Sequence, residues 1–163
     1  MTDFIVVNAE RLVNRNNIIF DIDGVLIDCS ERLERCEEES NGDRKAFWSC
    51  FLSPRYMHLD KPIEFGFEVL RDRIANGFNV VIVTGRTDNM ASETLEQLES
   101  QGITDIPVVF RKTGNLAKDY MYKLSVAKRL GLDVREVHDD SVDVLKSFGE
   151  VYPHAKLYLY ILQ

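Results

Sequence analysis

Two kinds of hydrophobic pattern alternate along the chain. Continuous runs of β-branched and other apolar residues, typical of buried strands, predict strands at 18–20, 79–86, 107–110 and 134–137. Weaker runs at 4–7 and 156–162 predict an edge strand and a last strand, the latter with a subunit contact as the alternative. The stretches between the strands repeat their apolar residues at helical spacing. Strands that alternate with helices predict βαβ units, a mainly parallel sheet and an α/β fold.

The helical stretches have recognisable ends. Ile63, Phe67, Leu70 and Ile74 recur at helical spacing, and Gly77 follows where a C-cap glycine belongs. The same reasoning predicts further helices at 30–39, 44–52, 91–101, 117–130 and 142–148. The first two of these predict a small helical cap inserted at about 28–61, too short for a large cap domain. The 163 residues therefore form one domain, 1–163, with that insertion.

Composition narrows the class of protein. Hydrophobic residues make up 45% and charged residues 29%, as in soluble globular proteins, and no apolar run approaches membrane-spanning length. The first residues lack the basic region and the apolar length of a signal peptide, so we expect a cytoplasmic protein without a membrane partner. Three cysteines, Cys29, Cys36 and Cys50, have no spacing for zinc or redox work, and we expect reduced thiols.

The net charge of −7 argues against a broad nucleic-acid-binding face. A net negative charge does not exclude the binding of one phosphate or a short strand end in a local basic pocket. Arg86, Arg111 and Lys112 are candidates for such a positive rim, with ordinary surface charge as the equal alternative. Phe47, Trp48 and Phe51 are interpreted as local packing in the cap rather than as a surface that stacks against bases.

Candidate chemistry begins where the first main strand ends. Asp21 and Asp23 stand on alternate residues, and Gly24 follows them. In an open α/β sheet, ligands bind just beyond the carboxyl ends of the strands. Two carboxylates there are costly unless a positive charge lies between them, and Mg²⁺ prefers oxygen ligands. A solvated turn is the alternative for this segment considered by itself.

Three further groups of functional type lie at or beyond the ends of the other strands. They are Thr84-Gly85-Arg86, the lysines Lys118 and Lys123, and Asp139-Asp140. Each has an ordinary explanation: a strand end, solvated helix lysines, or an N-cap aspartate. Their joint occurrence at one sheet edge favours a site for phosphoryl transfer. There a carboxylate attacks phosphorus, while a cation, a hydroxyl and a lysine offset the negative charge.

The set resembles the haloacid dehalogenase (HAD) superfamily of phosphohydrolases. The four matching motifs are Phe20-Asp-Ile-Asp-Gly-Val-Leu26, Val83-Thr-Gly-Arg86, a helix lysine, and His138-Asp-Asp-Ser141. The resemblance implies a three-layer Rossmann-like fold, with a mainly parallel sheet and a small helical cap, and an aspartyl-phosphate intermediate formed on a Mg²⁺-dependent phosphatase.

The resemblance also implies roles for individual residues. Asp21 is the expected nucleophile and Asp23 the general acid and base. Mg²⁺ is expected to bind Asp21, the backbone carbonyl of Asp23, and Asp139 or Asp140.

The remaining roles concern the phosphate. Thr84 is expected to hold a phosphoryl oxygen, and the motif lysine is Lys123 in preference to Lys118. Gly85, Arg86 and Lys118 complete the predicted substrate-binding set with Thr84.

Within the superfamily the chain is most similar to the 3′-phosphatase domain of bacteriophage-type polynucleotide kinase-phosphatases and their stand-alone relatives. The segments that carry this similarity are Asp28-Cys-Ser-Glu-Arg-Leu33, Asp60-Lys-Pro62, Val83-Thr-Gly-Arg-Thr-Asp88 and Lys118-Asp-Tyr-Met-Tyr-Lys123, with the paired Asp139-Asp140. Val25 and Ser141 depart from the usual pattern, and no P-loop is present. The expected partner is a phosphorylated substrate, either a nucleic-acid 3′ end or a small metabolite or mononucleotide. A catalytically idle binding module with the same fold is the third alternative.

Overall fold

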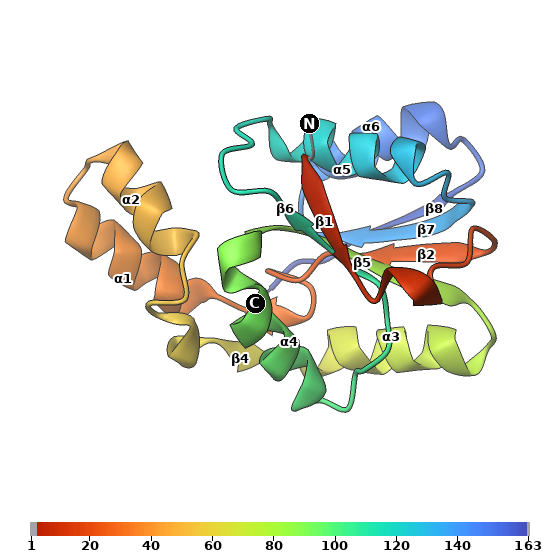
Figure 1. Cartoon of the computed structure of the whole chain (residues 1–163), viewed down its shortest axis with the longest axis horizontal. Coiled ribbons are helices and arrows are strands. Elements are labelled where there is room, and N and C mark those ends of the chain that lie inside the picture. The colour runs from red at the N-terminus through yellow and green to blue at the C-terminus, as the bar shows by residue number, and fades with distance from the viewer. Residues whose placement is uncertain (1–2, 163) are drawn as a thin grey trace.

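A six-stranded sheet between two layers of helices forms the centre of the computed structural model, which describes residues 3–162 (Figure 1). The strand order is β1-β6-β5-β2-β7-β8, and every neighbouring pair is parallel except β1 with β6. The strands are β1 (Phe4–Val7), β2 (Asn17–Phe20), β5 (Asn79–Thr87), β6 (Val108–Arg111), β7 (Val134–Asp139) and β8 (Lys156–Leu159). The predicted mainly parallel α/β fold is confirmed. Of the domain predicted at 1–163, residues 1, 2 and 163 lie outside the described part.

Four helices cover the two faces of the sheet. They are α3 (Glu64–Ala75), α4 (Ala91–Glu99), α5 (Asp119–Arg129) and α6 (Val142–Val151). Successive side chains of a strand point to opposite faces, so Ile18 and Phe20 of β2 pack with α3 and α4, while Ile19 packs with α5 and α6. No helix among the described residues is long and apolar enough to span a membrane.

Strand β2 has a central place in the sheet. Its four residues are all buried, and it pairs in parallel with β5 on one side and β7 on the other. In this register Phe20 lies opposite Ile82 of β5 and His138 of β7. The carboxyl ends of the three strands therefore meet at one edge, where the sequence motifs lie.

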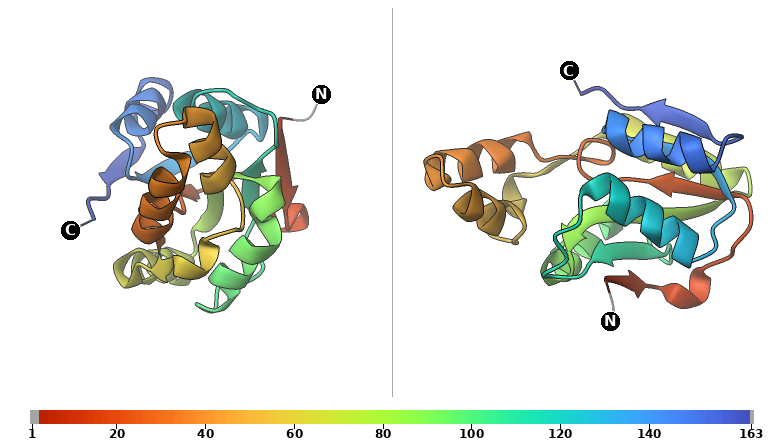
Figure 2. Two further views of the ribbon diagram at one scale, coloured as in Figure 1. Left: turned by 90° about the vertical axis from the view of Figure 1, so that its left-hand side faces the viewer. Right: turned by 90° about the horizontal axis from the view of Figure 1, so that it is seen from above.

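The segment predicted as a cap contains α1 (Ser30–Ser40) and α2 (Arg44–Phe51), which project from the end of the core (Figure 2). The Asp43 carboxylate caps α2 by accepting hydrogen bonds from the backbone N–H groups of Lys45 and Ala46. A short two-stranded sheet of β3 (Ile27–Asp28) and β4 (Lys61–Pro62) joins the helices to the core. This sheet has no signal in the sequence, because two-residue strands have no readable periodicity.

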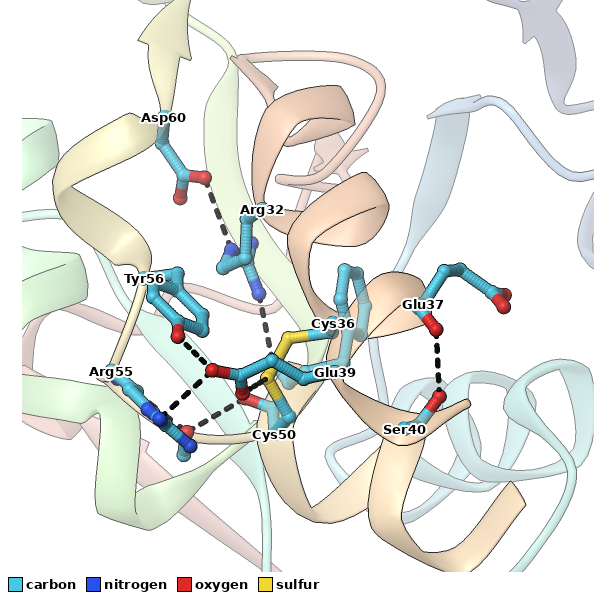
Figure 3. Close-up of a disulfide and its surroundings, with 11 residues drawn as sticks. Arg32, Cys36, Glu37, Glu39, Ser40, Cys50, Arg55, Tyr56 and Asp60 are labelled. Atoms are coloured by element: carbon cyan, nitrogen blue, oxygen red, sulfur yellow. Dashed lines mark hydrogen bonds and ion pairs between the residues drawn. A yellow bond between two sulfur atoms is a disulfide. The ribbon is translucent and has the colours of Figure 1, made fainter. Parts of the chain in front are cut away.

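The cap contains a disulfide between Cys36 and Cys50 (Figure 3). Cys29 is a free thiol. The expectation of three reduced thiols is therefore wrong for two of them. The turn at Asn41-Gly42 folds α2 back on α1 and brings the two Cα atoms to 5.7 Å. That proximity is a property of the helical hairpin, and a separation of 14 residues carries no local signal for it.

Several element boundaries differ from the predicted ones. β8 ends at Leu159, three residues earlier than predicted, although the backbone N–H of Tyr160 still donates to the carbonyl of Asp139 over 2.9 Å. The Tyr160 hydroxyl lies 2.8 Å from His138 Nδ1. Helix α5 begins at Asp119 with Lys118 as its N-cap residue, two positions later than predicted. Three short 3₁₀ helices, η1 (Ala9–Arg11), η2 (Met57–Leu59) and η3 (Asp88–Met90), complete the named elements.

Candidate active site

Three carboxylates meet at the shared edge of β2 and β7. Asp21 directly follows β2, and its backbone N–H donates to the carbonyl of His138 over 3.0 Å. Asp139 ends β7, and Asp140 is the next residue. One carboxylate oxygen from each of Asp21, Asp139 and Asp140 lies within 4.8 Å of the others. The parallel register thus brings together acids that are more than one hundred residues apart in sequence.

Lys123 places an ammonium group between these carboxylates. Its Nζ lies 3.0 Å from Asp21 Oδ1 and 2.8 Å from Asp139 Oδ2, and 3.3 Å from Asp119 Oδ2. The neighbouring Tyr122 is buried in the core, and Lys123 is itself 1% exposed. Burial lowers the pKa of a lysine, but Asp21 and Asp139 outweigh it and raise the pKa of Lys123 well above its usual range. Lys118 lies exposed at the N-terminus of α5 and is not part of this contact.

The negative charge of the cluster exceeds what Lys123 offsets. Burial raises the pKa of Asp21 well above its ordinary range against the opposing effect of Lys123, and Asp139 adds to the increase. Burial, and then the charge of Asp139, raise the pKa of Asp140 to about 6. Such shifts are expected where like charges crowd together without a sufficient counter-charge. Oxygen donors in this arrangement suit a hard divalent cation such as Mg²⁺.

Asp23 is held apart from this cluster by two arginines. Arg86 donates from Nε to Oδ2 over 3.1 Å and from Nη2 to Oδ1 over 2.7 Å, and Arg32 donates from Nη2 to Oδ1 over 3.0 Å. Burial by itself would raise the pKa of Asp23, but the ion pairs with Arg86 and Arg32 outweigh it and lower this pKa.

The same two arginines bind Asp60, which follows η2. Arg32 Nε lies 3.0 Å from Asp60 Oδ1, and Arg86 Nη2 lies 3.2 Å from Asp60 Oδ2. All three side chains are nearly inaccessible, with 0% exposure for Arg32 and 1% for Arg86 and Asp60. The sequence analysis found Asp60 only as part of the family resemblance and assigned no role to Arg32, because α1 reads as a charged, solvated helix.

The predicted substrate-binding residues divide into two groups. Thr84 is buried, and its Oγ1 accepts from the backbone N–H of Arg86 over 3.0 Å. The Arg86 side chain is engaged with Asp23 and Asp60, so any contact with substrate competes with these ion pairs. Gly85 and Lys118 line a large cavity that also contains Asp21 and Asp140 in its wall. Substrate binding by this set stays a prediction.

A cavity of about 1060 Å³ extends from the carboxylates to the cap and the C-terminal segment. Its wall includes Asp21, Asp23 and Asp140, several apolar side chains of the cap, and residues 159–162. The three aromatic residues of α2 differ in position. Phe47 is buried beside the disulfide, as the packing interpretation expects, whereas Trp48 is 48% exposed and faces the cavity together with Phe51.

The three candidates for a positive rim all form ion pairs within the protein. Arg86 is paired with Asp23, Arg111 donates to Asp119 and to the carbonyls of 115 and 117, and Lys112 pairs with Asp88. Each of these basic groups already has an acidic partner, a relation that net charge and sequence position do not reveal.

The ring contacts of His138 are all with neighbouring side chains of the protein core. It is fully buried, stacks against Phe20 and Tyr158, and its ring nitrogens contact Glu136 and Tyr160, each over 2.8 Å.

No family model matches the chain, and no curated protein matches it by sequence. Among solved structures, the structure of a Pnkp1/Rnl/Hen1 complex matches with a TM-score of 0.65 and 18% identity. That match covers 88% of this chain and 45% of the other, so the chain spans less than half of its counterpart. A putative beta-phosphoglucomutase from Thermotoga maritima matches with a TM-score of 0.62 and 17% identity, over 91% of this chain and 86% of that one. A HAD hydrolase of family IA, variant 3, from Entamoeba histolytica matches with a TM-score of 0.56 and 14% identity, over 87% and 82%. These matches confirm the predicted HAD-like fold.

Proposed function

We propose that this protein is a Mg²⁺-dependent phosphomonoester hydrolase that works through an aspartyl-phosphate intermediate. The observation that carries the proposal is the position of Lys123, within 3.0 Å of both Asp21 and Asp139 at the carboxyl ends of β2 and β7. One buried ammonium group among crowded carboxylates suits a site that receives a phosphoryl dianion together with a divalent cation. The fold, shared with HAD hydrolases and phosphatases, supports the same reading.

In the proposed reaction the Asp21 carboxylate attacks phosphorus, the bond to the leaving alcohol breaks, and protonated Asp23 gives its proton to the alcohol oxygen. Because the ion pairs with Arg86 and Arg32 lower the pKa of Asp23, this step requires that bound substrate draws these arginines away from the carboxyl group. Asp23 then accepts a proton from water as the water attacks the phosphorus of the aspartyl phosphate. The carboxylate of Asp21 and inorganic phosphate are the products. Thr84 and nearby backbone N–H groups hold phosphoryl oxygens, and Lys123 offsets the charge that develops on them.

The metal ligands proposed are Asp21, Asp139, Asp140 and the backbone carbonyl of Asp23. Mg²⁺ bound there would offset the repulsion between the attacking carboxylate and the phosphate. The raised pKa values of Asp21 and Asp140 fit a cluster that is short of positive charge.

For the substrate we propose the 3′-phosphate end of a polynucleotide. The likeness to a Pnkp1/Rnl/Hen1 complex and a cavity of about 1060 Å³, larger than a phosphate requires, support this choice. A small metabolite or mononucleotide is the second candidate, since the catalytic groups would be the same. We also propose a cytoplasmic location. The Cys36–Cys50 disulfide is unusual for a strongly reducing compartment.

The test compares Asp21→Asn with the wild type on a panel of oligonucleotide 3′-phosphates, mononucleotides and sugar phosphates. With Mg²⁺ present, we expect phosphate release to fall about 10³-fold or more, because the nucleophile is lost. Asp105→Asn makes the same chemical change at an exposed residue far from the site and should leave activity unchanged. A chelator in excess should stop the wild type reversibly. A wild type that releases no phosphate from the panel would support the idle binding module instead.

A further inference from the structure

The cavity wall supplied by the cap is apolar and aromatic. Trp48 of α2 is 48% exposed and Leu33 of α1 is 42% exposed, and both line the cavity with Phe51 and Leu52. Leu116, from the loop before α5, is 94% exposed and lines it as well. Large apolar side chains that remain exposed inside a concave site are typical of a surface that binds an apolar part of a ligand.

The indole of Trp48 packs against two other aromatic rings of α2. It packs edge-on against Phe47 at 5.1 Å and against Phe51 at 6.1 Å between ring centroids. Phe47 is buried with the Cys36–Cys50 disulfide, so Trp48 rests on a cross-linked part of the cap core. A ring that is already ordered loses little conformational entropy when a ligand stacks on it.

Positive charge in the cavity is scarce. The basic residues that line it are Lys45, Arg86, Arg111 and Lys118. Both arginines are bound to aspartates of the protein. Within residues 3–162 neither lysine forms an ion pair, and both are exposed. The cavity therefore has two free cations for phosphates in addition to the catalytic centre.

We propose that the cap contains a binding subsite for one nucleobase of the leaving group, with Trp48 as its stacking surface, and that recognition extends over no more than about two nucleotides. This inference rests on the proposed phosphatase function and specifies how its substrate is recognised. A flat ring beside a phosphate matches an aromatic wall next to the catalytic carboxylates. Two lysines suit a short strand end and are too few to follow a long polyanion.

The first test uses oligonucleotide 3′-phosphates that carry either a normal or an abasic 3′-terminal nucleotide. The wild type should prefer the normal end in kcat/KM, and Trp48→Ala should reduce this preference about tenfold. Trp48→Phe keeps a stacking surface and should retain most of it. Ile74→Ala alters an apolar residue of similar exposure outside the cavity and should leave the preference intact.

The second test varies the length of the strand and the salt concentration. Turnover should stop improving beyond about two nucleotides. With two phosphate contacts, the slope of log(kcat/KM) against log[salt] should be about −1.4. Lys45→Met together with Lys118→Met should bring the slope close to zero.

The two tests can refute the proposed nucleobase subsite independently of the proposed phosphatase function. A wild type that releases phosphate equally well from normal and abasic ends, or a preference unchanged by Trp48→Ala, would overturn it. Continued improvement with length and a slope steeper than about −3 would also do so. Failure of the phosphatase proposal looks different, because no substrate would then release phosphate in an Asp21-dependent way.

Discussion

At the scale of single residues, burial together with an excess of carboxylates around Lys123 accounts for the raised pKa values in the site. The pKa of Asp21 is raised by burial and by its acidic neighbours even though Lys123 opposes the change. A bound cation would reduce the repulsion among these carboxylates. The carboxylates keep their positions because the core fixes the strands that carry them.

Gly24 shows how closely the chain packs against this cluster. Its φ is +87°, and a Cβ built on it would lie 2.1 Å from Asp140 Oδ2. We predict that Gly24→Ala lowers the free energy of unfolding by about 1 kcal/mol through backbone strain and also displaces Asp140, so that phosphate release falls at least tenfold. Chemical denaturation and a phosphate-release assay measure the two effects.

Gly42 provides the matched control for this prediction. Its φ is +88°, and no atom lies within 4 Å of a Cβ built there. Gly42→Ala should therefore have a similar cost in stability and normal activity. If both variants lose activity to the same degree, the contact between Gly24 and Asp140 has no role in the site.

Sequence reasoning located the acids of the site and Arg86, although with a role in substrate binding, and it gave no role to Arg32. Asp21 and Asp23 stand out because polar residues interrupt an apolar strand. Arg32 lies in a helix crowded with glutamates, where one more charge looks solvated. Its burial depends on how α1 sits against Asp60, which is a tertiary relation without a local pattern.

At the scale of elements, the main strands and helices were predicted because each has a period or a terminating glycine to mark it. Helix α3 ends next to Gly77, and β5 covers the predicted apolar run with one extra residue at its end. The β3–β4 sheet was missed because it is set by the closure of the cap insertion. The disulfide was missed for a similar reason, since it depends on the hairpin of α1 and α2.

The disulfide gives a testable role to the cap as an element. A cross-link between residues 14 positions apart stabilises a local segment by about 3 kcal/mol. We predict that replacing both Cys36 and Cys50 by serine increases amide hydrogen exchange in residues 30–51, while the sheet keeps its protection. The KM for a nucleobase-containing substrate should rise more than kcat falls, because Trp48 then rests on a cap core without the cross-link.

Cys29 serves as the control because it is a free thiol in the same region. Cys29→Ser should leave the exchange pattern of α1 and α2 as in the wild type. A dithiol reductant should reproduce the effect of the double serine variant in the wild type, forming two thiols as the reductant becomes a disulfide. Equal exchange in the oxidised and reduced protein would contradict the proposed role of the cross-link.

At the scale of the whole molecule, Arg32 joins the cap to the catalytic edge. Its guanidinium donates to Asp60 Oδ1, to the carbonyl of Phe51 and to Asp23 Oδ1 over 3.0, 2.8 and 3.0 Å. One side chain therefore contacts the linker after η2, the end of α2 and the candidate general acid. The position of the cap and the orientation of Asp23 are coupled through it.

Arg32→Lys tests this coupling because it keeps the charge and removes the planar set of donors. A lysine ammonium cannot make all three contacts in these directions, so at least one buried partner loses its hydrogen bond. We predict a loss of about 2 kcal/mol in the free energy of unfolding. We also predict a clear decrease in kcat, because Asp23 would no longer be bound by both Arg32 and Arg86. Arg11→Lys makes the same change at an exposed arginine outside the cap, 4.0 Å from Asp105, and should shift stability by less than about 0.5 kcal/mol. A change in KM with kcat unaffected would mean that Arg32 positions the cap and not Asp23, while wild-type behaviour in both assays would show that Arg86 holds Asp23 without help.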